Sequence, residues 1–321
     1  MKKLILTFFT FFLLLSTLKA QDQMQAPIND CQKTNREIFL QRNAELYKEY
    51  STIDAHVAMT EVKKAFWIPG RPGVDKALFL AHGYMGTPAE MKFIAEPFIK
   101  DGWTVVGFLI PGHGSSSFVS NQYKYERWIK EMKIQLELVT DCFSEVRASG
   151  FSTGGLLLHN YVLTEKIPAS LKSLHLVSPF FIQRFGGFFE RILGVFVNGM
   201  SVDTAYFISR FRDLKVMTID KQNYNQNIPI DTAFQVKELG QKVYGMKESS
   251  QEFSKIQIPV QVFLSEGDWT VDTDSTKEVM NRDYENVQLV WYEGSEPHHL
   301  MAPSVSHVAG EVQRLIFSFK Q

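Results

Sequence analysis

The amino-acid sequence predicts an α/β protein whose sheet is mostly parallel and is covered by helices on both faces. The main observation is that short apolar runs alternate with longer segments of helical spacing, which is the pattern of parallel β-α-β units. Composition agrees: 45% of the 321 residues are hydrophobic and 21% are charged, which is too apolar for a disordered chain. The length allows one large domain or two small ones, with a sizeable buried core.

The strand candidates are short apolar runs that end at loop-forming residues. Run 77–81 is followed by His82-Gly83, and run 103–109 is followed closely by Pro111-Gly112. Chemistry in parallel sheets collects at the carboxyl ends of the strands, so functional side chains are expected in the loops after these runs. The other strand candidates are 146–148, 173–177, 260–264 and 287–291.

Helix candidates fill the intervals between these strands. Segment 88–100 lies between the first two strand candidates, segment 125–143 lies before the third, and an apolar helical run begins at Gly154. Segment 35–50 precedes the first strand and is also rich in helix formers.

The alternation stops between about residues 180 and 230. This segment is rich in aromatic residues and contains helical stretches. We interpret it as an insertion that packs over the sheet as a helical cap. An ordinary pair of core helices is the alternative.

The N-terminus has the pattern of a secretory signal peptide. Met1-Lys2-Lys3 precedes the apolar run Leu4–Leu18, and Lys19-Ala20 leads into a polar segment. An uncleaved membrane anchor is the alternative, but the run is shorter than the roughly 20 residues that span a bilayer. We therefore expect cleavage after residue 20 and export to the periplasm or the medium, with no stable membrane span afterwards. The prediction divides the rest into an N-terminal helical extension, 21–60, and a main domain, 61–321.

Charge and cysteine content exclude several classes of protein. Removing residues 1–20 leaves 31 basic and 35 acidic residues, which argues against binding to a nucleic-acid backbone. Cys31 and Cys142 either form a disulfide or remain two thiols, and the sequence leaves both open. There is no Cys-x-x-Cys pair and no Cys/His cluster. A structural zinc site therefore has no ligands to use. The sequence implies no metal and no organic cofactor.

The strongest motif is Gly150-Phe151-Ser152-Thr153-Gly154, which matches Gly-x-Ser-x-Gly between a strand and a helix. A sharp turn there exposes the serine, and the first N–H groups of the following helix point towards the place where an oxyanion forms. The context predicts Ser152 as a nucleophile, with a structural turn as the alternative.

A nucleophilic serine needs a base, and the base needs an acid that orients it. Asp268 follows strand candidate 260–264 and is the predicted acid. Glu266, Asp272 and Asp274 are rivals in the same loop.

The base is expected after the last strand candidate, 287–291. His298 and His299 are both placed there, and we favour His298 because Pro297 stiffens the approach to it. His299 stays open as the alternative base. The sequence assigns no role to four other histidines, His56, His159, His175 and His307.

The loop His82-Gly83-Tyr84-Met85-Gly86 follows the first strong strand candidate. Its glycines let the backbone curl beneath the nucleophile, so the N–H groups of Tyr84 and Thr153 are the predicted oxyanion hole. A plain turn between strand and helix is the alternative.

Together these motifs resemble the α/β-hydrolase superfamily, closest to its carboxylesterase and monoacylglycerol-lipase branch. The resemblance runs from about residue 77 to 317. It rests on LFLAHGYMGTPAEM, LIPGHG at 109–114, GFSTGG at 150–155, SEGDWTV at 265–271 and PHHLM at 297–301.

The resemblance implies an α/β-hydrolase fold with an eight-stranded, mostly parallel sheet and a helical cap after the sixth strand. It places Ser152, Asp268 and His298 at the catalytic positions and Tyr84 and Thr153 in the oxyanion hole, with His113 as a supporting residue. Thr153 departs from the family, where Met or Gln is commoner, but only its backbone N–H is needed.

The predicted function is hydrolysis of small-molecule or lipid-like carboxylic esters through an acyl-enzyme. Thioesterase, peptidase and long-chain lipase activities use the same triad and remain alternatives. A non-catalytic binding protein of the same fold is a further alternative, because fold does not fix function.

Overall fold

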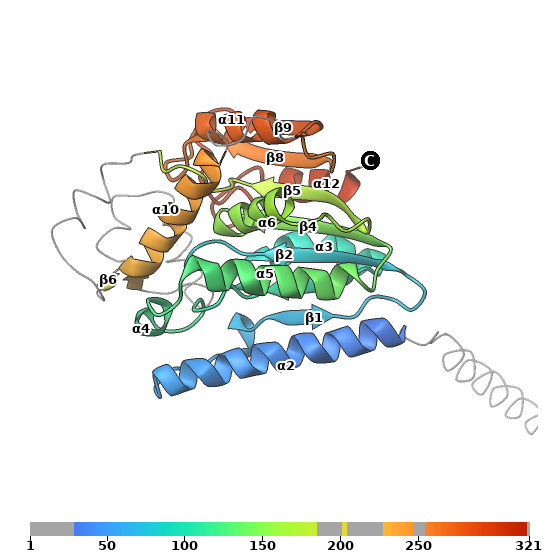
Figure 1. Ribbon diagram of the computed structural model, residues 1–321. Helices are drawn as coiled ribbons and strands as arrows, with labels where there is room; N and C mark the ends of the chain where they lie inside the picture. Colours follow the sequence, from blue (N-terminus) through green and yellow to red (C-terminus); the bar gives the residue numbers. More distant parts are fainter. Residues whose placement is uncertain (1–28, 185–200, 204–226, 247–253, 320–321) are drawn as a thin grey trace, which may run out of the picture.

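A computed structural model describes residues 29–184, 201–203, 227–246 and 254–319 (Figure 1). Its main sheet has the strand order β1-β3-β2-β4-β5-β8-β9. β1 pairs antiparallel with β3, and every other pairing in this sheet is parallel. The strands are β1 (Phe66–Ile68), β2 (Lys76–Ala81), β3 (Thr104–Phe108), β4 (Glu145–Phe151), β5 (Leu171–Val177), β8 (Val260–Ser265) and β9 (Val287–Tyr292).

This sheet confirms the predicted mostly parallel arrangement, and each predicted strand is present. The predicted number of strands is wrong for the described residues, because their main sheet has seven strands and not eight. At the β1 edge, the chain before β1 forms a long helix, α2 (Asp30–Ile53), in place of a further strand. That segment is rich in charged residues and helix formers and has no run with strand alternation. β1 was not predicted, because three residues are too few to show a pattern.

Helices cover the two faces of the sheet with separate hydrophobic clusters. α5 and α6 pack on one face together with parts of α10 and α11, whereas α3 and α12 pack together on the other face (Figure 1). The helices predicted outside the cap segment are confirmed. The helices are α3 (Lys92–Asp101), α4 (Ser117–Ser120), α5 (Tyr125–Thr140), α6 (Thr153–Thr164), α10 (Ile230–Gly245), α11 (Thr273–Asp283) and α12 (Ala309–Ser318), with short 3-10 turns η1 (Glu61–Lys63) and η2 (Pro88–Met91).

The N-terminal helix α2 is held firmly against the main domain. It runs along the β1 edge of the sheet and packs on α5 and β1 (Figure 1). A disulfide joins Cys31 at its start to Cys142 after α5, so the structure decides the open question of the two cysteines in favour of pairing. The Arg42 guanidinium contacts both carboxylate oxygens of Glu131 at 2.9 Å.

Two sequence predictions fall wholly or mostly outside the described residues. The predicted signal peptide, 1–20, lies outside them entirely. Most of the predicted cap, about 180–230, also does; inside it are the short antiparallel pair β6 (Ser201–Asp203) and β7 (Asn227–Pro229). Among the described helices, none combines the length and the apolar character that crossing a membrane requires.

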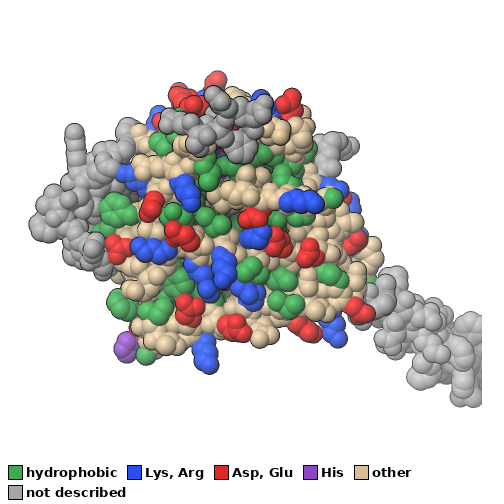
Figure 2. Space-filling model, in the orientation of Figure 1, with side chains coloured by type: hydrophobic (Ala, Val, Ile, Leu, Met, Phe, Trp, Pro, Cys, Tyr) green, Lys and Arg blue, Asp and Glu red, His purple; other side chains and the backbone are tan. Residues whose placement is uncertain are grey.

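Basic and acidic side chains alternate on the face that carries α2 and α5 (Figure 2). Ion pairs account for part of this pattern, since Arg127 lies 3.4 Å from Glu131 on α5, and Lys133 lies 3.2 Å from Glu137. Because the signs are mixed, this face presents no broad region of one charge.

Candidate active site

Ser152 occupies a sharp turn between β4 and α6. Its backbone has φ 49° and ψ −112°, a conformation that is costly for a residue with a side chain. Small neighbours make the turn possible: a Cβ on Gly154 would lie 2.1 Å from the carbonyl oxygen of Ala81, and one on Gly150 would lie 2.7 Å from the backbone of Gly154. The motif glycines are therefore required by backbone packing, as the nucleophile-turn interpretation expects.

The turn is fixed to the sheet and to the helix by backbone hydrogen bonds. The Ser152 N–H donates to the Val177 carbonyl oxygen at 2.9 Å, and the Ser152 carbonyl accepts from the Leu156 N–H at 3.0 Å. Thr153 is the first residue of α6, so its N–H belongs to the first turn, where no carbonyl within the helix can accept it. This N–H is therefore not bonded within the helix, and its role as an oxyanion donor stays a prediction.

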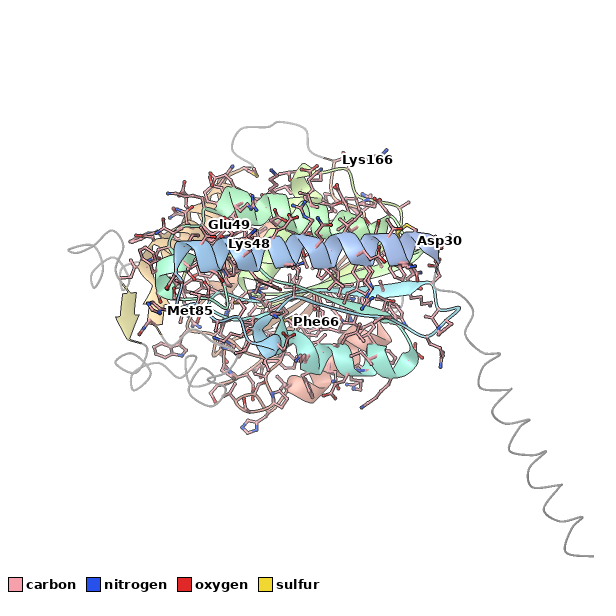
Figure 3. The ribbon with its side chains drawn as sticks, turned by 90° about the horizontal axis from the view of Figure 1, so that it is seen from below. Asp30, Lys48, Glu49, Phe66, Met85 and Lys166 are labelled. Carbon is pink, nitrogen blue, oxygen red and sulfur yellow. A yellow bond between two sulfur atoms is a disulfide. The ribbon has the colours of Figure 1, made fainter. Side chains whose placement is uncertain are left out.

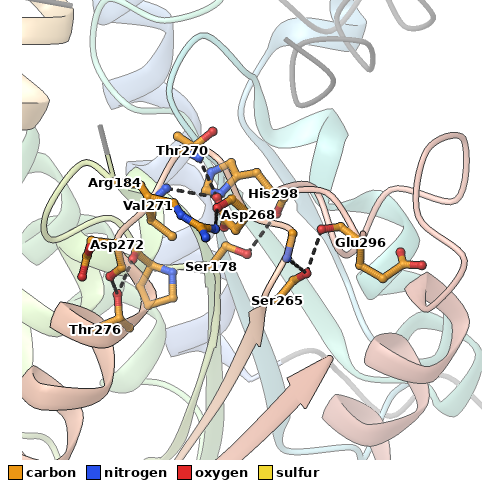
Figure 4. A network of polar contacts seen from close by, with 12 residues as sticks. Ser178, Arg184, Ser265, Asp268, Thr270, Val271, Asp272, Thr276, Glu296 and His298 are labelled. Carbon is orange, nitrogen blue, oxygen red and sulfur yellow. Dashed lines mark hydrogen bonds and ion pairs between the residues drawn. The ribbon is translucent and has the colours of Figure 1, made fainter. Parts of the chain in front are cut away.

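Asp268 and His298 are brought together from loops after β8 and β9. His298 Nδ1 lies 2.7 Å from Asp268 Oδ2, and the Asp268 side chain is fully buried (Figure 4). The second carboxylate oxygen, Oδ1, accepts the backbone N–H groups of Thr270 at 2.8 Å and Val271 at 3.0 Å. Three hydrogen bonds thus compensate the burial of this carboxylate.

The other three acidic residues of this loop, which the sequence left open as the catalytic acid, make different contacts. Glu266 Oε2 accepts the N–H of Gly294 at 2.9 Å. Asp272 is the N-cap of α11, where its Oδ1 accepts the N–H of Ser275 at 2.7 Å. The Asp274 side chain is 90% exposed and lies 3.2 Å from Lys277. Of the four carboxylates, Asp268 is the one hydrogen-bonded to His298.

The two adjacent histidines both pack on Phe151, the residue before Ser152. The ring centroid of Phe151 lies 5.0 Å from that of His298 and 4.9 Å from that of His299. His298 is additionally positioned through its backbone, because Ser178 Oγ donates to its carbonyl oxygen at 2.9 Å. The bond to Asp268 is therefore the contact by which the surroundings of His298 differ from those of His299.

Arg184 hydrogen-bonds to the backbone of residues 266–272, the loop that carries Asp268 and that we call the acid loop. This contact was not predicted from the sequence. Its guanidinium donates to the backbone carbonyls of Asp268 and, at 2.8 Å, of Glu266 (Figure 4). Its own N–H donates to the Thr270 carbonyl oxygen at 3.2 Å. An isolated arginine at the start of an irregular segment gives no sequence pattern that could have identified it.

Tyr84 lies in a tight turn after β2, and its role as the second oxyanion donor stays a prediction. The Gly86 N–H donates to the Gly83 carbonyl oxygen at 3.2 Å across the turn, and Met85 between them has φ 63°. The Tyr84 hydroxyl donates to the carbonyl oxygen of Pro229 at 2.6 Å. Burial raises the pKa of Tyr84 well above its usual value, which keeps this hydroxyl a neutral donor.

The His113 ring packs against the side chain of Tyr84, and its supporting role stays a prediction. Its ring centroid is 6.0 Å from that of Tyr84, 5.6 Å from that of Trp128 and 5.4 Å from that of His82. Burial lowers the pKa of His113 to about 4, so the ring is neutral at pH 7. His82 Nε2 in turn accepts the Ile110 N–H at 3.0 Å.

The N-terminal helix also reaches this region, which the sequence did not predict. The buried Tyr50 hydroxyl accepts the Gly112 N–H at 2.6 Å, next to His113. Figure 3 shows Lys48 and Glu49, near this end of α2, on the same side of the molecule as Met85, whereas Asp30 lies at the opposite end. The C-terminal end of α2 therefore helps to hold a loop that contacts the candidate site.

Comparison with known families decides the classification. The sequence profile described as serine aminopeptidase, S33, matches residues 72–302, which include Ser152, Asp268 and His298. The chain belongs to this hydrolase family. Comparison with curated proteins found no match. Helix α2 lies outside the matched residues, so the contact of Tyr50 with the 110–114 loop belongs to an element that the S33 profile does not include.

Solved structures show that this S33 hydrolase has the α/β-hydrolase fold. It is similar to one of the metagenome-derived lipolytic enzymes LipS and LipT, with 13% identity and a TM-score of 0.61, over 82% of this chain and 98% of the other. A monoglyceride lipase from Saccharomyces cerevisiae has 16% identity and a TM-score of 0.58, over 79% of this chain and 90% of the other. The Paleococcus ferrophilus monoacylglycerol lipase has 18% identity and a TM-score of 0.57, over 81% of this chain and 96% of the other. At these identities the likeness concerns the fold.

Proposed function

We propose that this S33 hydrolase cleaves carboxylic esters with Ser152 as nucleophile, His298 as base and Asp268 as the acid that orients the base. The observation that carries the proposal is the 2.7 Å contact between His298 Nδ1 and Asp268 Oδ2, with His298 packed on Phe151 beside the strained Ser152 turn.

The proposed reaction has two halves. With Nδ1–H donated to Asp268, His298 Nε2 accepts the Ser152 proton as Oγ attacks the ester carbonyl. The N–H groups of Tyr84 and Thr153 stabilise the negative charge on the carbonyl oxygen. His298 then gives the proton to the leaving alcohol, an acyl-enzyme forms, and water activated by His298 releases the acid. Asp268 stabilises the imidazolium that forms in each half.

The proposed substrate is a small-molecule or lipid-like ester. Support comes from the likeness to a monoglyceride lipase and to a monoacylglycerol lipase. Amide hydrolysis is the second candidate, and the description of the matched family as serine aminopeptidases favours it.

The test is hydrolysis of p-nitrophenyl esters from acetate to laurate by the mature protein, with Ser152→Ala in parallel and aminoacyl p-nitroanilides as the amide series. We expect ester hydrolysis that is lost in Ser152→Ala, and labelling of Ser152 by a fluorophosphonate probe. If the probe labels Ser152 and the protein cleaves the p-nitroanilides but not the esters, it is a peptidase and not an esterase. A folded protein that neither hydrolyses nor is labelled would overturn the proposal and favour a binding protein.

We also propose that the protein is exported, to the periplasm or the medium. The signal-peptide pattern supports this, and so does the Cys31–Cys142 disulfide, because disulfides persist mainly in oxidising compartments. Cell fractionation with N-terminal sequencing tests it. The expected mature protein begins at Gln21, and a cytoplasmic protein that keeps Met1 would contradict export.

A further inference from the structure

A buried carboxylate lies directly behind the turn that carries Tyr84. Glu90 is part of the 3-10 turn η2, and its side chain is 2% exposed. One carboxylate oxygen accepts the backbone N–H of Gly83, the first residue of the turn. A buried backbone N–H is costly to leave without an acceptor, and the Glu90 carboxyl oxygen supplies that acceptor. Glu90 therefore holds the backbone of this turn.

The same carboxylate also contacts the other end of the turn. A Cβ placed on Gly86 would lie 2.4 to 2.7 Å from the three atoms of the Glu90 carboxylate. Glu90 is itself fixed to the chain just after the turn, since its N–H donates to the Thr87 carbonyl oxygen at 3.0 Å. The peptide between Gly83 and Tyr84 is held directly by the bonds of the Gly86 N–H and of His82 Nδ1 to the Gly83 carbonyl oxygen. Glu90 adds contact at both ends of this four-residue turn and so restricts the backbone on either side of that peptide.

The turn is also pressed against the ring that supports the base. A Cβ on Gly83 would lie 2.7 Å from Phe151 Cδ1 and 3.4 Å from Glu90 Oε1, so both side chains pack close to this glycine. Phe151 also contacts the His298 ring. Packing is therefore continuous from the Glu90 carboxylate through the turn and Phe151 to the proposed base. Loss of the carboxylate would let the turn withdraw from Phe151.

His82 does not substitute for this contact. Its Nδ1 lies 4.0 Å from Glu90 Oε1, but 2.8 Å from the Gly83 carbonyl oxygen, to which it donates. Its Nε2 accepts the Ile110 N–H, so the ring is the neutral Nδ1–H tautomer. Of the two side chains, Glu90 holds the N–H of Gly83 and His82 holds the carbonyl.

We propose that Glu90 is a positioning residue of the oxyanion hole: its carboxylate fixes the Gly83–Gly86 turn so that the Tyr84 N–H points at the reacting carbonyl. The inference rests on the proposed ester hydrolysis and adds a residue to that site. Glu90 acts through the backbone that it holds, and an acceptor oxygen is what this role requires.

The test compares Glu90→Ala, Glu90→Gln and Glu90→Asp. Alanine removes the acceptor, glutamine retains an amide oxygen of the same reach, and aspartate is one methylene too short for the bond. We expect Glu90→Ala to lower kcat about 10- to 100-fold, less than loss of a whole oxyanion donor, with KM changed less than about threefold. Glu90→Gln should stay within about fivefold of wild type, and Glu90→Asp should resemble alanine. Glu96→Ala on α3, where the side chain is 55% exposed, is the matched control.

A second measurement does not depend on turnover. Hydrogen exchange at the Gly83 amide should be slow in wild type and Glu90→Gln and faster in Glu90→Ala. Unchanged exchange and kcat in Glu90→Ala would overturn the proposal. So would a Glu90→Gln variant that keeps Gly83 protected but loses as much kcat as alanine, because the charge would then be what matters. If wild type hydrolyses nothing and resists the probe, the proposed function fails, and exchange still decides whether Glu90 holds the turn. If Glu90→Ala does not fold, Glu90→Asp takes its place.

Discussion

At the scale of single residues, backbone strain within the described chain is concentrated at the candidate site. Three non-glycine residues there have positive φ: Met85 at 63°, Ser152 at 49° and Ser178 at 44°. Met85 shapes the oxyanion turn, Ser152 is the proposed nucleophile, and Ser178 hydrogen-bonds the backbone of His298. Each such conformation costs on the order of 1–3 kcal/mol and persists only where surrounding contacts enforce it. The contacts that hold these three loops are therefore required to keep the backbone of the candidate site in this conformation.

Two adjacent histidines allow a direct test of the base. We expect His298→Ala to lower kcat for ester hydrolysis by on the order of 10³-fold or more, because it removes the group bonded to Asp268. His299→Ala should cost about tenfold or less, since His299 contributes packing on Phe151. Steady-state kinetics of both variants, with thermal melting as a fold control, decide the question. A larger loss in His299→Ala would reassign the base.

The sequence predicted the proposed reacting groups, but it did not predict the residues that hold them in place. Ser152 was proposed from the Gly-x-Ser-x-Gly motif between a predicted strand and a predicted helix, and Asp268 from its place after strand candidate 260–264. Spacing could not separate His298 from His299, since adjacent residues follow the same strand. Glu90 and Arg184 bond to backbone atoms, and a bond of that kind leaves no pairing of side-chain types for a sequence pattern to show.

At the scale of elements, the chain that leads from β5 into the predicted cap is joined to the acid loop. Gln183 and Val271 form an antiparallel bridge, and the Asp272 N–H donates to the Ile182 carbonyl oxygen at 2.8 Å. Arg184 adds its guanidinium bonds to the carbonyls of Glu266 and Asp268. Any shift of residues 182–184 therefore moves the backbone that carries the proposed catalytic acid.

We expect Arg184→Met to lower kcat about 5- to 20-fold through misplacement of Asp268, and Arg184→Lys to recover part of the loss with one donor group. The bell-shaped pH profile of kcat/KM should shift in Arg184→Met, because the environment of the Asp268–His298 pair changes. Arg314→Gln on α12, an exposed arginine, is the control. A loss confined to KM, with the pH profile unchanged, would assign Arg184 to substrate binding.

The longer elements were predictable and their contacts were not. Helical spacing identified the core of α2, yet nothing in segment 35–50 predicted the Tyr50–Gly112 bond or the Arg42–Glu131 pair. These contacts depend on tertiary placement at the β1 edge. The prediction of an eighth strand came from the family resemblance, which begins at about residue 77. In the described residues the chain before β1 forms α2 and not a further strand of the main sheet.

At the scale of the whole molecule, the Cys31–Cys142 disulfide closes a loop of sequence separation 111. In the chain-entropy model, a cross-link over about 100 residues stabilises the folded state by up to about 4–5 kcal/mol. We expect the Cys31→Ser/Cys142→Ser variant to lose a large part of this free energy of unfolding in urea titrations, while kcat at 25 °C changes less than about threefold. Dithiothreitol should destabilise wild type to a similar extent and leave the variant unchanged. Equal stability of all forms would mean that the noncovalent contacts of α2 suffice.

Buried histidines give the whole molecule a predictable sensitivity to acid. Burial lowers the pKa of His113 to about 4 and that of His175 to about 3, and it also lowers the pKa values of His82 and His159. In the unfolded chain a histidine binds its proton near pH 6.5. As the pH falls below 6.5, the unfolded state therefore takes up protons that the folded state does not. Stability is then lost progressively down to the folded pKa values.

His175 offers the cleanest test, because it lies in β5, away from the loops of the candidate site. Its ring lies 3.1 Å from Gln261 Oε1 and from Ser173 Oγ. Between pH 6 and pH 4 a single such histidine steepens the fall in unfolding free energy by about 1.4 kcal/mol per pH unit. We expect urea titrations of His175→Gln to show a slope shallower than wild type by about that amount, whatever its stability at pH 7, with the exposed His56→Gln as control. An unchanged slope would mean that the folded state accepts a proton at His175, and that the strand opens locally to admit it before global unfolding.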